Sequence, residues 1–407
     1  MPGDLEDAEL FAGPGGWDVA AQLLGIRAKG LEWDKAACST AIAAGHIRML
    51  DAEGKGLDVS AADPPALFPG GIRLLIASPP CQAFSSAGKG LGRKGAAFIL
   101  MGIQLIAWGN DPAQVIKWVD EQLEDDRAAL VLEPLRWILA AHPEMVAMEQ
   151  VATVLPLWEA YAEVLRNLGY SVWTGNLQAE QYDVPQTRKR AFLIASRTHE
   201  VSAPAPMRRK YRKDRKTGEH NRYKKFLADD PGLKPWISMS DALGFGMTQR
   251  PSVSVVTVVG GGYPLDGGSG ALRTVQSAKD SGDWQEKAFG LTQRPSYTIC
   301  AGGTDTGGPE PFGNGARQQM RKAIEEGKWC WLGSSNGQQY HPRSDATRIT
   351  VQEAAIIQGF PADYPWQGNK GEQHRQVGDA VPPPLAWHVL RAVLGLPSQH
   401  YPGTENL

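Results

Sequence analysis

The chain has few cysteines, and none lies in a pattern that binds a metal or forms a disulfide framework. Only four occur in 407 residues, at positions 38, 81, 300 and 330. No two are spaced as C-x-x-C, and the histidines include no H-E-x-x-H motif. Disulfide frameworks belong to short secreted domains, and metal sites need clustered ligands. The sequence therefore predicts no metal site and a reducing compartment.

Long apolar runs and an excess of basic residues are also missing. No stretch approaches the roughly 20 apolar residues of a membrane span. The N-terminus, MPGDLEDAEL, is acidic where a secretory signal is basic. The net charge of −2 gives no global sign of nucleic-acid binding. These absences predict a cytoplasmic protein without a membrane partner.

Short apolar runs alternate with helical patterns in the first half of the chain. The apolar runs that are candidate strands are followed by a Gly-rich turn, an acidic residue or a pair of prolines. This alternation is typical of an α/β fold with a doubly wound, mostly parallel sheet. The expected strands are residues 8–12, 28–34, 72–78, 144–150 and 190–196. The expected helices are residues 17–25, 35–45, 127–143, 154–170, 350–360 and 382–396.

The composition changes near residue 198. Residues 208–225 hold ten Lys and Arg residues, and the chain then becomes rich in Gly, Thr, Ser and Val. The sequence T-Q-R-P-S occurs twice, within 247–262 and 291–308, each time before a β-branched run and glycines. Two copies are too few for a solenoid. They predict a small, irregular β-rich domain. The domains expected are 1–197, 198–345 and a C-terminal return, 346–407, that completes the first domain.

The turn FAGPGG (residues 11–16) joins the first expected strand to the first expected helix. Glycines let a backbone turn sharply and approach a ligand closely, although such turns also serve packing alone. Glu32 and Trp33 follow the second strand, where a carboxylate often binds ribose hydroxyls and an indole can stack on a base. Asp58 would end a third strand and meet the base. Solvated carboxylates are the alternative. Because no Lys or Arg lies beside the glycines, the ligand predicted is a nucleoside without phosphates.

Cys81 follows the strand 72–78 in the sequence S-P-P-C-Q. A lone cysteine is usually a small buried hydrophobic residue. Here two prolines hold the chain in one extended path at the carboxyl edge of the sheet. The polar, Gly-rich stretch 82–97 that follows is long enough to cover a site. A thiol presented in this way is a candidate nucleophile, provided that its thiolate is stabilised.

A carboxylate and two guanidiniums are expected beside this thiol. Glu149 lies near the end of the strand 144–150. Arg188 and Arg190 lie in Q-T-R-K-R and share a face of the next strand, since side chains alternate with a period of two. Alone, Q-T-R-K-R would be a surface basic patch.

The chain resembles the DNA (cytosine-5) methyltransferase family. The blocks that carry the resemblance occur in the family's order: FAGPGG, EWD, LDV, SPPCQAFS, EQV, QTRKR, TRITVQEAAIIQGFP and QVGDAVPPPLA. They cover most of residues 8–197 and 345–396. The stretch between them resembles the family's target-recognition region. The resemblance implies a Rossmann-like methyltransferase fold and activity in a bacterial or phage-infected cell.

The resemblance implies S-adenosylmethionine as the methyl donor and no metal. The cofactor-binding residues it implies are Phe11, Gly13, Gly15, Gly16, Glu32, Trp33, Asp58, Pro80, Gln376, Gly378 and Asp379. The catalytic residues it implies are Cys81, Glu149, Arg188 and Arg190. We expect DNA contacts from Gln82, Ser85 and Arg93 after the cysteine, from Arg208 and Arg209 in the basic run, and from Arg250 and Arg294 in the repeated units. The alternatives are a solvated basic run and arginines that stabilise the turns before the strands.

In the chemistry that the resemblance implies, Cys81 adds to C6 of a cytosine while Glu149 protonates N3. C6 cannot be reached in a stacked duplex, so the base must be flipped out. The partner is double-stranded DNA, bound by a monomer, and a cognate restriction endonuclease is a further candidate partner. An RNA cytosine-5 methyltransferase and a weakly active DNA-binding regulator are the alternatives.

Two positions depart from the family's pattern. Gln150 stands where the family has asparagine in E-N-V, and Asp379 stands where it has asparagine in G-N-x-V-P-P. The second exchange places a carboxylate near the cofactor.

Overall fold

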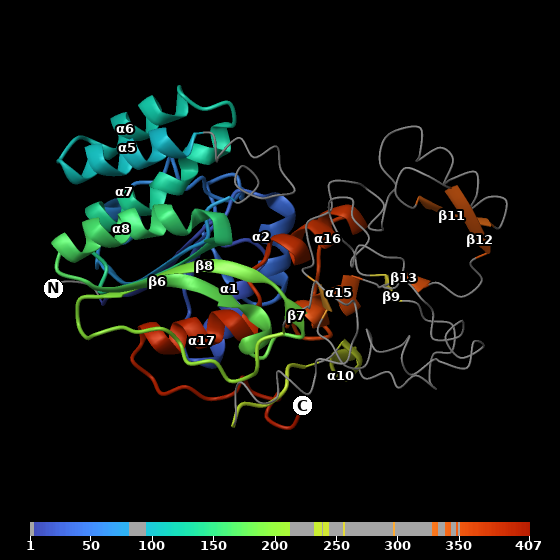
Figure 1. Ribbon diagram of the computed structural model, residues 1–407. Coiled ribbons are helices and arrows are strands. Elements are labelled where there is room, and N and C mark those ends of the chain that lie inside the picture. Colours follow the sequence, from blue (N-terminus) through green and yellow to red (C-terminus); the bar gives the residue numbers. More distant parts are fainter. Residues whose placement is uncertain are drawn as a thin grey trace.

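The computed structural model describes residues 4–80, 95–211, 232–237 and 351–407, together with short helical or strand segments between 239 and 348 (Figure 1). Cys81, Gln82, Ser85, Arg93, Arg250 and Arg294 lie outside the described residues. So does most of the expected domain 198–345, and its boundaries stay a prediction.

A seven-stranded sheet forms the centre of the protein. Its strands are β1 (Glu6–Leu10), β2 (Lys29–Leu31), β3 (Ile47–Arg48), β4 (Ile72–Ala77), β5 (Met145–Val151), β6 (Ser171–Gln178) and β8 (Lys189–Ser196). Their order is β3-β2-β1-β4-β5-β8-β6, and only β8 runs antiparallel to its neighbours. The predicted doubly wound, mostly parallel sheet is confirmed.

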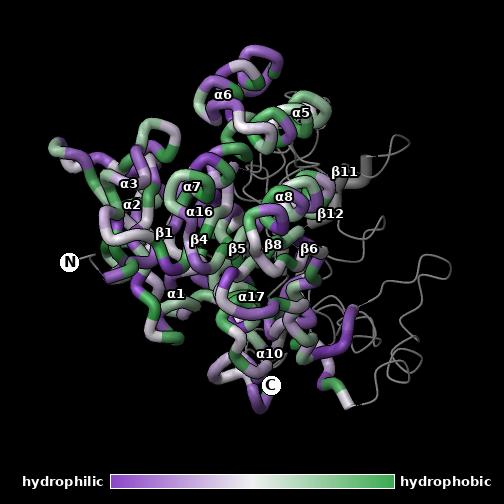
Figure 2. Tube along the Cα trace, turned by 90° about the vertical axis from the view of Figure 1, so that its left-hand side faces the viewer, coloured by the Kyte–Doolittle hydropathy of each residue, from purple (hydrophilic) through white to green (hydrophobic). Residues whose placement is uncertain are grey.

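Helices cover both faces of this sheet. The described helices are α1 (Gly16–Leu23), α2 (Lys35–Ala43), α3 (Pro64–Leu67), α5 (Ala96–Ala107), α6 (Pro112–Asp120), α7 (Glu133–Ala141), α8 (Leu155–Asn167), α10 (Met239–Leu243), α15 (Val351–Gln358), α16 (Lys370–Asp379) and α17 (Pro383–Val393). Seen along the sheet, α1 and α17 lie on one side and α5, α7 and α8 on the other (Figure 2). The C-terminal helix α17 thus completes a layer begun by α1.

Short strands outside the main sheet pair in three ways. They are β7 (Gln186–Thr187) with β10 (Ser296–Tyr297), β9 (Val255–Val256) with β13 (Thr347–Arg348), and β11 (Lys328–Leu332) with β12 (Gln338–Pro342). Each T-Q-R-P-S unit therefore contains one short strand, β9 or β10.

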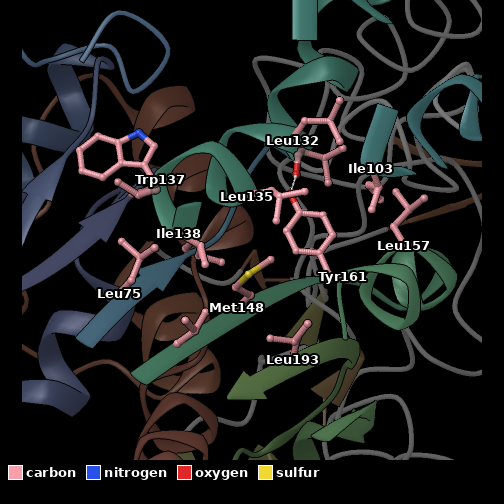
Figure 3. Close-up of a cluster of buried hydrophobic side chains, with 14 of the residues drawn as sticks. Leu75, Ile103, Leu132, Leu135, Trp137, Ile138, Met148, Leu157, Tyr161 and Leu193 are labelled. Atoms are coloured by element: carbon pink, nitrogen blue, oxygen red, sulfur yellow. Dashed lines mark hydrogen bonds between the residues drawn. The ribbon is translucent and has the colours of Figure 1, made fainter. Parts of the chain in front are cut away.

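The apolar strands bury side chains on both faces, as a central parallel strand requires. Leu75 of β4, Met148 of β5 and Leu193 of β8 pack toward the helices that carry Trp137 and Tyr161 (Figure 3). The Tyr161 hydroxyl donates a hydrogen bond of 2.6 Å to the Val131 carbonyl, which satisfies this buried polar group.

The opposite faces of the same strands build a second core. Leu74 and Ile76 of β4 and Phe192 of β8 pack with Leu385 and Leu390 of α17. Alternate residues of each strand point to opposite faces. Because both faces of these strands are buried, their sequences are continuous apolar runs. The return of the chain as α17 therefore buries a face that residues 1–197 would leave exposed.

Two predictions about elements were wrong. The third strand is β3, and Asp58 lies in an irregular segment where its carboxylate accepts hydrogen bonds from the Ser60 N–H and hydroxyl. The expected helix 127–143 is a 3-10 helix, Asp126–Leu132, followed by α7 with Pro134 in its first turn. Proline has no N–H and suits the start of a helix rather than its middle. The helices α5, α6 and α16 and the strand β6 were not predicted.

A buried carboxylate, Asp183, joins four separated parts of the chain. It lies after β6 with a left-handed φ of 61°. It accepts hydrogen bonds from Arg208 Nε (2.5 Å), His388 Nε2 (3.1 Å), His400 Nδ1 (3.0 Å) and the Tyr401 N–H (2.8 Å). Burial alone would raise its pKa, but these donors hold the pKa of Asp183 well below its usual range. The carboxylate is therefore charged and fully engaged.

We expect Asp183→Asn to lower the free energy of unfolding by about 3 kcal/mol at pH 7, because it leaves the buried Arg208 guanidinium without its counter-ion. Asparagine keeps the shape of the side chain and tolerates a positive φ, so the charge is what changes. Urea unfolding measures the loss. The matched control is Asp7→Asn, whose partner Arg73 is partly exposed and which should cost under about 1 kcal/mol. Equal losses in the two variants would contradict the prediction.

Candidate functional site

A pocket of about 350 Å³ lies at the carboxyl ends of the parallel strands. Open α/β sheets bind ligands at this edge. Its lining comes from the segments after β1, β2 and β4, from the end of β5, from β8 and from α16. An adjoining hollow of about 160 Å³ shares Phe11, Glu32, Trp33, Pro80 and Arg127 with the pocket. The two hollows form one continuous candidate site.

The Gly-rich turn after β1 supplies one wall of the pocket. Its backbone is left-handed at Phe11 (φ 55°), Gly13 (φ 53°) and Gly15 (φ 111°). A Cβ at Gly13 would meet nothing within 4 Å, whereas one at Gly16 would lie 2.3 Å from the Val381 carbonyl oxygen. The turn thus leaves open space at Gly13 and packs closely at Gly16.

Gly15 is required by packing. A Cβ at this position would lie 2.5 Å from the Tyr364 hydroxyl and 2.7 Å from the His46 ring. Phe11, Gly13 and Gly16 line the pocket, while Gly15 faces these two aromatic side chains. Packing therefore explains Gly15 and Gly16, while Gly13 faces the open pocket.

Glu32 holds a fixed position between the two hollows. One of its carboxylate oxygens accepts from the N–H groups of Trp33 and Asp34, and the other accepts from Gly13 N–H at 2.8 Å. Burial nevertheless raises its pKa. The indole of Trp33 is 66% exposed and lines both hollows. A rigid carboxylate beside an open aromatic face suits a ribose with an attached base.

The second hollow is an apolar slot with Asp58 at its edge. Leu31, Leu57, Val59 and Leu130 supply most of the remaining wall. Asp58 ends no strand but lines this slot, and its contact with a base stays a prediction.

Glu149 lies in the pocket beside two arginines. Its Oε1 is 3.0 Å from Arg190 Nε. Both guanidinium Nη atoms of Arg188 donate to the Gly378 carbonyl, at 2.9 and 3.0 Å. Burial raises the pKa of Glu149, and the attraction of Arg190 and Arg188 opposes that shift. Arg190 of β8 and Arg188, which directly precedes that strand, line the same pocket.

The two departures from the family's pattern occupy distinct places. Gln150 is buried, and its Nε2 donates to the Pro79 carbonyl at 2.7 Å while its Oε1 accepts from the Val151 N–H. The longer amide thus holds the P-P segment that precedes Cys81. Asp379 opens onto the pocket, yet enough protein surrounds it to raise its pKa to about 6.

The sequence of the chain matches one protein family over nearly its whole length. The profile of the C-5 cytosine-specific DNA methylase family matches residues 5–107 and 119–395. The chain belongs to this DNA methylase family. The match is interrupted between residues 107 and 119, which is where α5 ends and α6 begins.

Relatives of the chain are found in bacteria and plants. The chain is 26% identical to the type II methyltransferase M.PspPI of Psychrobacter sp. over 401 residues, which cover 95% of this chain and 78% of that protein. It is 24% identical to DNA (cytosine-5)-methyltransferase 3 of Arabidopsis thaliana over 371 residues, covering 80% of this chain. The chain spans only 23% of the length of that plant enzyme.

Solved structures resemble the methylase in fold. The S. pombe Dnmt2 methyltransferase superposes with a TM-score of 0.51 at 14% identity, covering 96% of this chain and 99% of that one. A mutant of Spodoptera frugiperda DNMT2 gives a TM-score of 0.52 at 14% identity, covering 96% and 100%.

Cys81 lies outside the described residues, but its neighbour in the sequence, Pro80, is described. Pro80 lines both hollows of the methylase, and Cys81 comes directly after it. Of the other cysteines, Cys38 is buried, its thiol donates to the Glu32 carbonyl, and burial raises its pKa to about 11. A thiol of this kind is a poor nucleophile, so Cys38 does not compete for the role.

The prediction that Arg208 contacts DNA was wrong. Its side chain is 1% exposed, and it donates to Asp183 and to the carbonyls of Pro235, Thr404 and Leu407. Neither phosphate nor a base edge can reach these donors. Arg209 is half-buried, and its N–H donates to the Lys234 carbonyl.

Several pocket residues of the methylase were missed in the sequence. They are Glu9, Asp34, Arg127 and Arg375. Arg127 follows a long excursion of the chain through α5 and α6 and returns to the same rim as Pro80, where Asp125 holds it with two hydrogen bonds of 2.9 Å. Arg375 directly precedes the predicted Gln376, so proximity to a motif was the one available signal.

The part of the chain that the structure describes holds no group of three or more His, Cys, Asp and Glu residues able to bind a metal ion. Nor does any helix among those residues have the length and apolar character needed to cross a membrane.

Proposed function

We propose that the chain is a site-specific DNA methyltransferase that transfers a methyl group from S-adenosylmethionine to C5 of cytosine. The observation that carries this proposal is a single pocket that combines a Gly-rich turn, the fixed carboxylate of Glu32 and the buried Glu149 with its arginines. Cys81 follows the Pro80 rim of that pocket. The membership in the DNA methylase family supports the same reading.

The residues present fit an adenosine-containing methyl donor. Glu32 would bind the ribose, Trp33 would pack on the adenine, and Asp58 would meet its amino group at the end of the apolar slot. Glu9 lines the pocket, is 1% exposed, and its Oε2 has no hydrogen-bond partner. Burial and the neighbouring Asp18 raise the pKa of Glu9 well above its usual range, so this oxygen is a polar group that a ligand in the pocket could satisfy. When bound, the donor supplies an electrophilic methyl group on a positively charged sulfur.

The remaining pocket residues would activate the cytosine. The Cys81 thiolate adds to C6, Glu149 gives a proton to N3, and C5 becomes nucleophilic toward the methyl group. A base such as water then takes the C5 proton, which restores the double bond and expels Cys81 as a thiolate, and N3 returns its proton to Glu149. Arg190 would hold the base's carbonyl oxygen while keeping its own proton. Arg188, directly before β8, connects this part of the chain to α16 by donating to the Gly378 carbonyl.

Double-stranded DNA is the substrate we propose, with the target base flipped into the pocket. The cations of the run 209–225 would contact phosphates. The type II methyltransferases among the relatives make a cognate restriction endonuclease a candidate partner, and we propose that a monomer acts on DNA.

The decisive experiment is incubation with radiolabelled S-adenosylmethionine and plasmid DNA, followed by bisulfite sequencing. Methylcytosine at one short motif is the expected result. Label in RNA alone would favour an RNA cytosine-5 methyltransferase. Tight DNA binding without incorporation would favour a regulator of the same fold.

We expect Asp379→Asn to reduce the preference for S-adenosylmethionine over S-adenosylhomocysteine by about threefold or more at pH 8, because a carboxylate attracts the charged sulfur and not the neutral thioether. Burial raises the pKa of Asp379 to about 6, so the carboxyl group is charged above that pH and neutral below it. At pH 5 the variant and the unaltered protein should therefore show the same ratio of affinities for the two ligands. Calorimetric titration at both pH values measures the ratio, and the same difference at pH 5 and pH 8 would contradict the prediction.

A further inference from the structure

Three consecutive carbonyl groups of the Gly-rich turn are held by side chains from distant parts of the chain. Arg48 Nη2 donates to the carbonyls of Ala12 (3.2 Å) and Gly13 (3.0 Å). The Tyr364 hydroxyl donates to the carbonyl of Pro14 at 2.5 Å. Hydrogen bonds therefore hold the turn to β3 through Arg48 and to the segment after α15 through Tyr364.

Arg48 is built into the interior of the protein. Its side chain is 0% exposed, and Nη2 also lies 2.7 Å from Asp18 Oδ2, in the first turn of α1. Burial opposes a charge here, but Asp18 and Glu9 raise the pKa of Arg48. One guanidinium therefore joins the turn to the helix that follows it. Ion pairs buried in this way are costly to break from one side.

Gly30 makes room for this guanidinium. A Cβ at Gly30 would lie 2.5 Å from Arg48 Nη1 and 2.9 Å from Ala12 Cβ. Distances below 3.0 Å do not occur for real Cβ atoms, so any side chain at position 30 would displace the end of Arg48.

The turn needs such support because its backbone is strained. Phe11 has a left-handed φ of 55° although it is not a glycine, which costs of order 1 kcal/mol or more. A conformation of this kind persists only where surrounding contacts impose it. Arg48 and Tyr364 provide them, and neither residue lines the pocket itself.

We propose that Arg48 and Tyr364 are positioning residues that set the affinity for the methyl donor by holding the turn 11–16 in its ligand-binding shape. This inference rests on the proposed function, because it assigns the turn to S-adenosylmethionine. The two residues act on binding of the donor and not on the chemistry at the cytosine.

The test measures the Kd of S-adenosylhomocysteine by calorimetry, and KM and kcat for methylation. Arg48→Met should raise Kd and KM at least about tenfold, since hydrogen bonds to a charged group are lost. Tyr364→Phe should raise them about threefold to tenfold through one lost hydrogen bond. In both, kcat at saturating donor should stay within about twofold.

Two further variants separate positioning from general stability. Gly30→Ala keeps Arg48 but displaces it and should reproduce the rise in Kd. Arg48→Lys keeps a buried cation that can donate to Ala12, Gly13 and Asp18 and should recover part of the affinity. The control is Arg73→Met. It removes the ion pair between Arg73 of β4 and Asp7 of β1, the strand that precedes the turn, and should leave the Kd of S-adenosylhomocysteine unchanged.

The outcomes are distinguishable. An unaltered protein that fails to bind S-adenosylhomocysteine overturns the proposed function. An unaltered protein that binds it, with Tyr364→Phe and Gly30→Ala binding equally well, overturns the positioning role even if Arg48→Met does not fold. A fall in kcat with an unchanged Kd would also refute it.

Discussion

Replacing Cys81 by Ala is expected to abolish methylation while leaving the binding of donor and DNA intact. The physical reason is that C5 of cytosine is a poor nucleophile until a thiolate has added at C6. Alanine keeps the path that Pro79 and Pro80 impose on the chain but offers no sulfur. The loss should reach the detection limit of a labelled-methyl assay, because the reaction has no other covalent route.

A covalent trap distinguishes a lost nucleophile from a misfolded site. DNA with 5-fluorocytosine at the target position cannot lose its C5 substituent as a proton, so the thiol adduct persists. We expect a protein–DNA adduct, stable to denaturing electrophoresis, from the unaltered protein and none from Cys81→Ala. Cys38→Ala removes a buried thiol with a raised pKa and should retain the adduct. Methylation by Cys81→Ala, or an adduct lost only in Cys38→Ala, would rule out the assignment of Cys81.

Glu149→Gln should lower the rate of methylation by about 10²- to 10⁴-fold, the usual contribution of a general acid. Glutamine keeps the volume of the side chain but cannot give a proton to N3. Affinities for donor and DNA should change far less than the rate, and single-turnover kinetics separates the two.

The pH dependence gives a second readout for Glu149. Burial raises the pKa of Glu149, and the group acts in its protonated form. The rate of the unaltered protein should therefore be retained below this raised pKa and fall as the pH rises through it. The residual rate of Glu149→Gln should lack that fall. The matched control is Asp7→Asn, which breaks the ion pair of Asp7 with Arg73 (2.6 Å) near the start of β1, outside the lining of both hollows. An equal loss of rate in the control would mean that a broken ion pair, and not the proton, is responsible.

Much of the pocket was predictable because its residues follow apolar strands. Glu32, Pro80 and Glu149 lie at or near strand ends, and a parallel sheet brings such ends to one edge. The fate of Arg208 was not predictable in this way. It depends on Asp183, 25 residues earlier, and on carbonyls as distant as Leu407. A cation within a basic run carries no local sign that it will be buried.

The support of the Gly-rich turn was invisible for the same reason. Arg48 lies on a two-residue strand, and Tyr364 lies 350 residues from the carbonyl it binds. Neither belongs to a periodic pattern, and each acquires its partner only when the chain returns. Asp58 gives the converse case. Its element was predicted wrongly, yet it lines the expected hollow because the sheet edge and not the strand decides its place.

Hydrogen bonds between described residues fix the two places from which the segment between Arg208 and Val351 leaves the main body of the protein. Arg208 is locked to Asp183 at one end, and Gln186 Nε2 donates to Gln358 Oε1 at 2.6 Å at the other. Lengthening a loop whose ends are already held costs little free energy, since the entropy of closure grows only with the logarithm of its length. The length and sequence of this segment can therefore change without altering the pocket residues. Proteins with the same pocket could thus evolve with different intervening sequences.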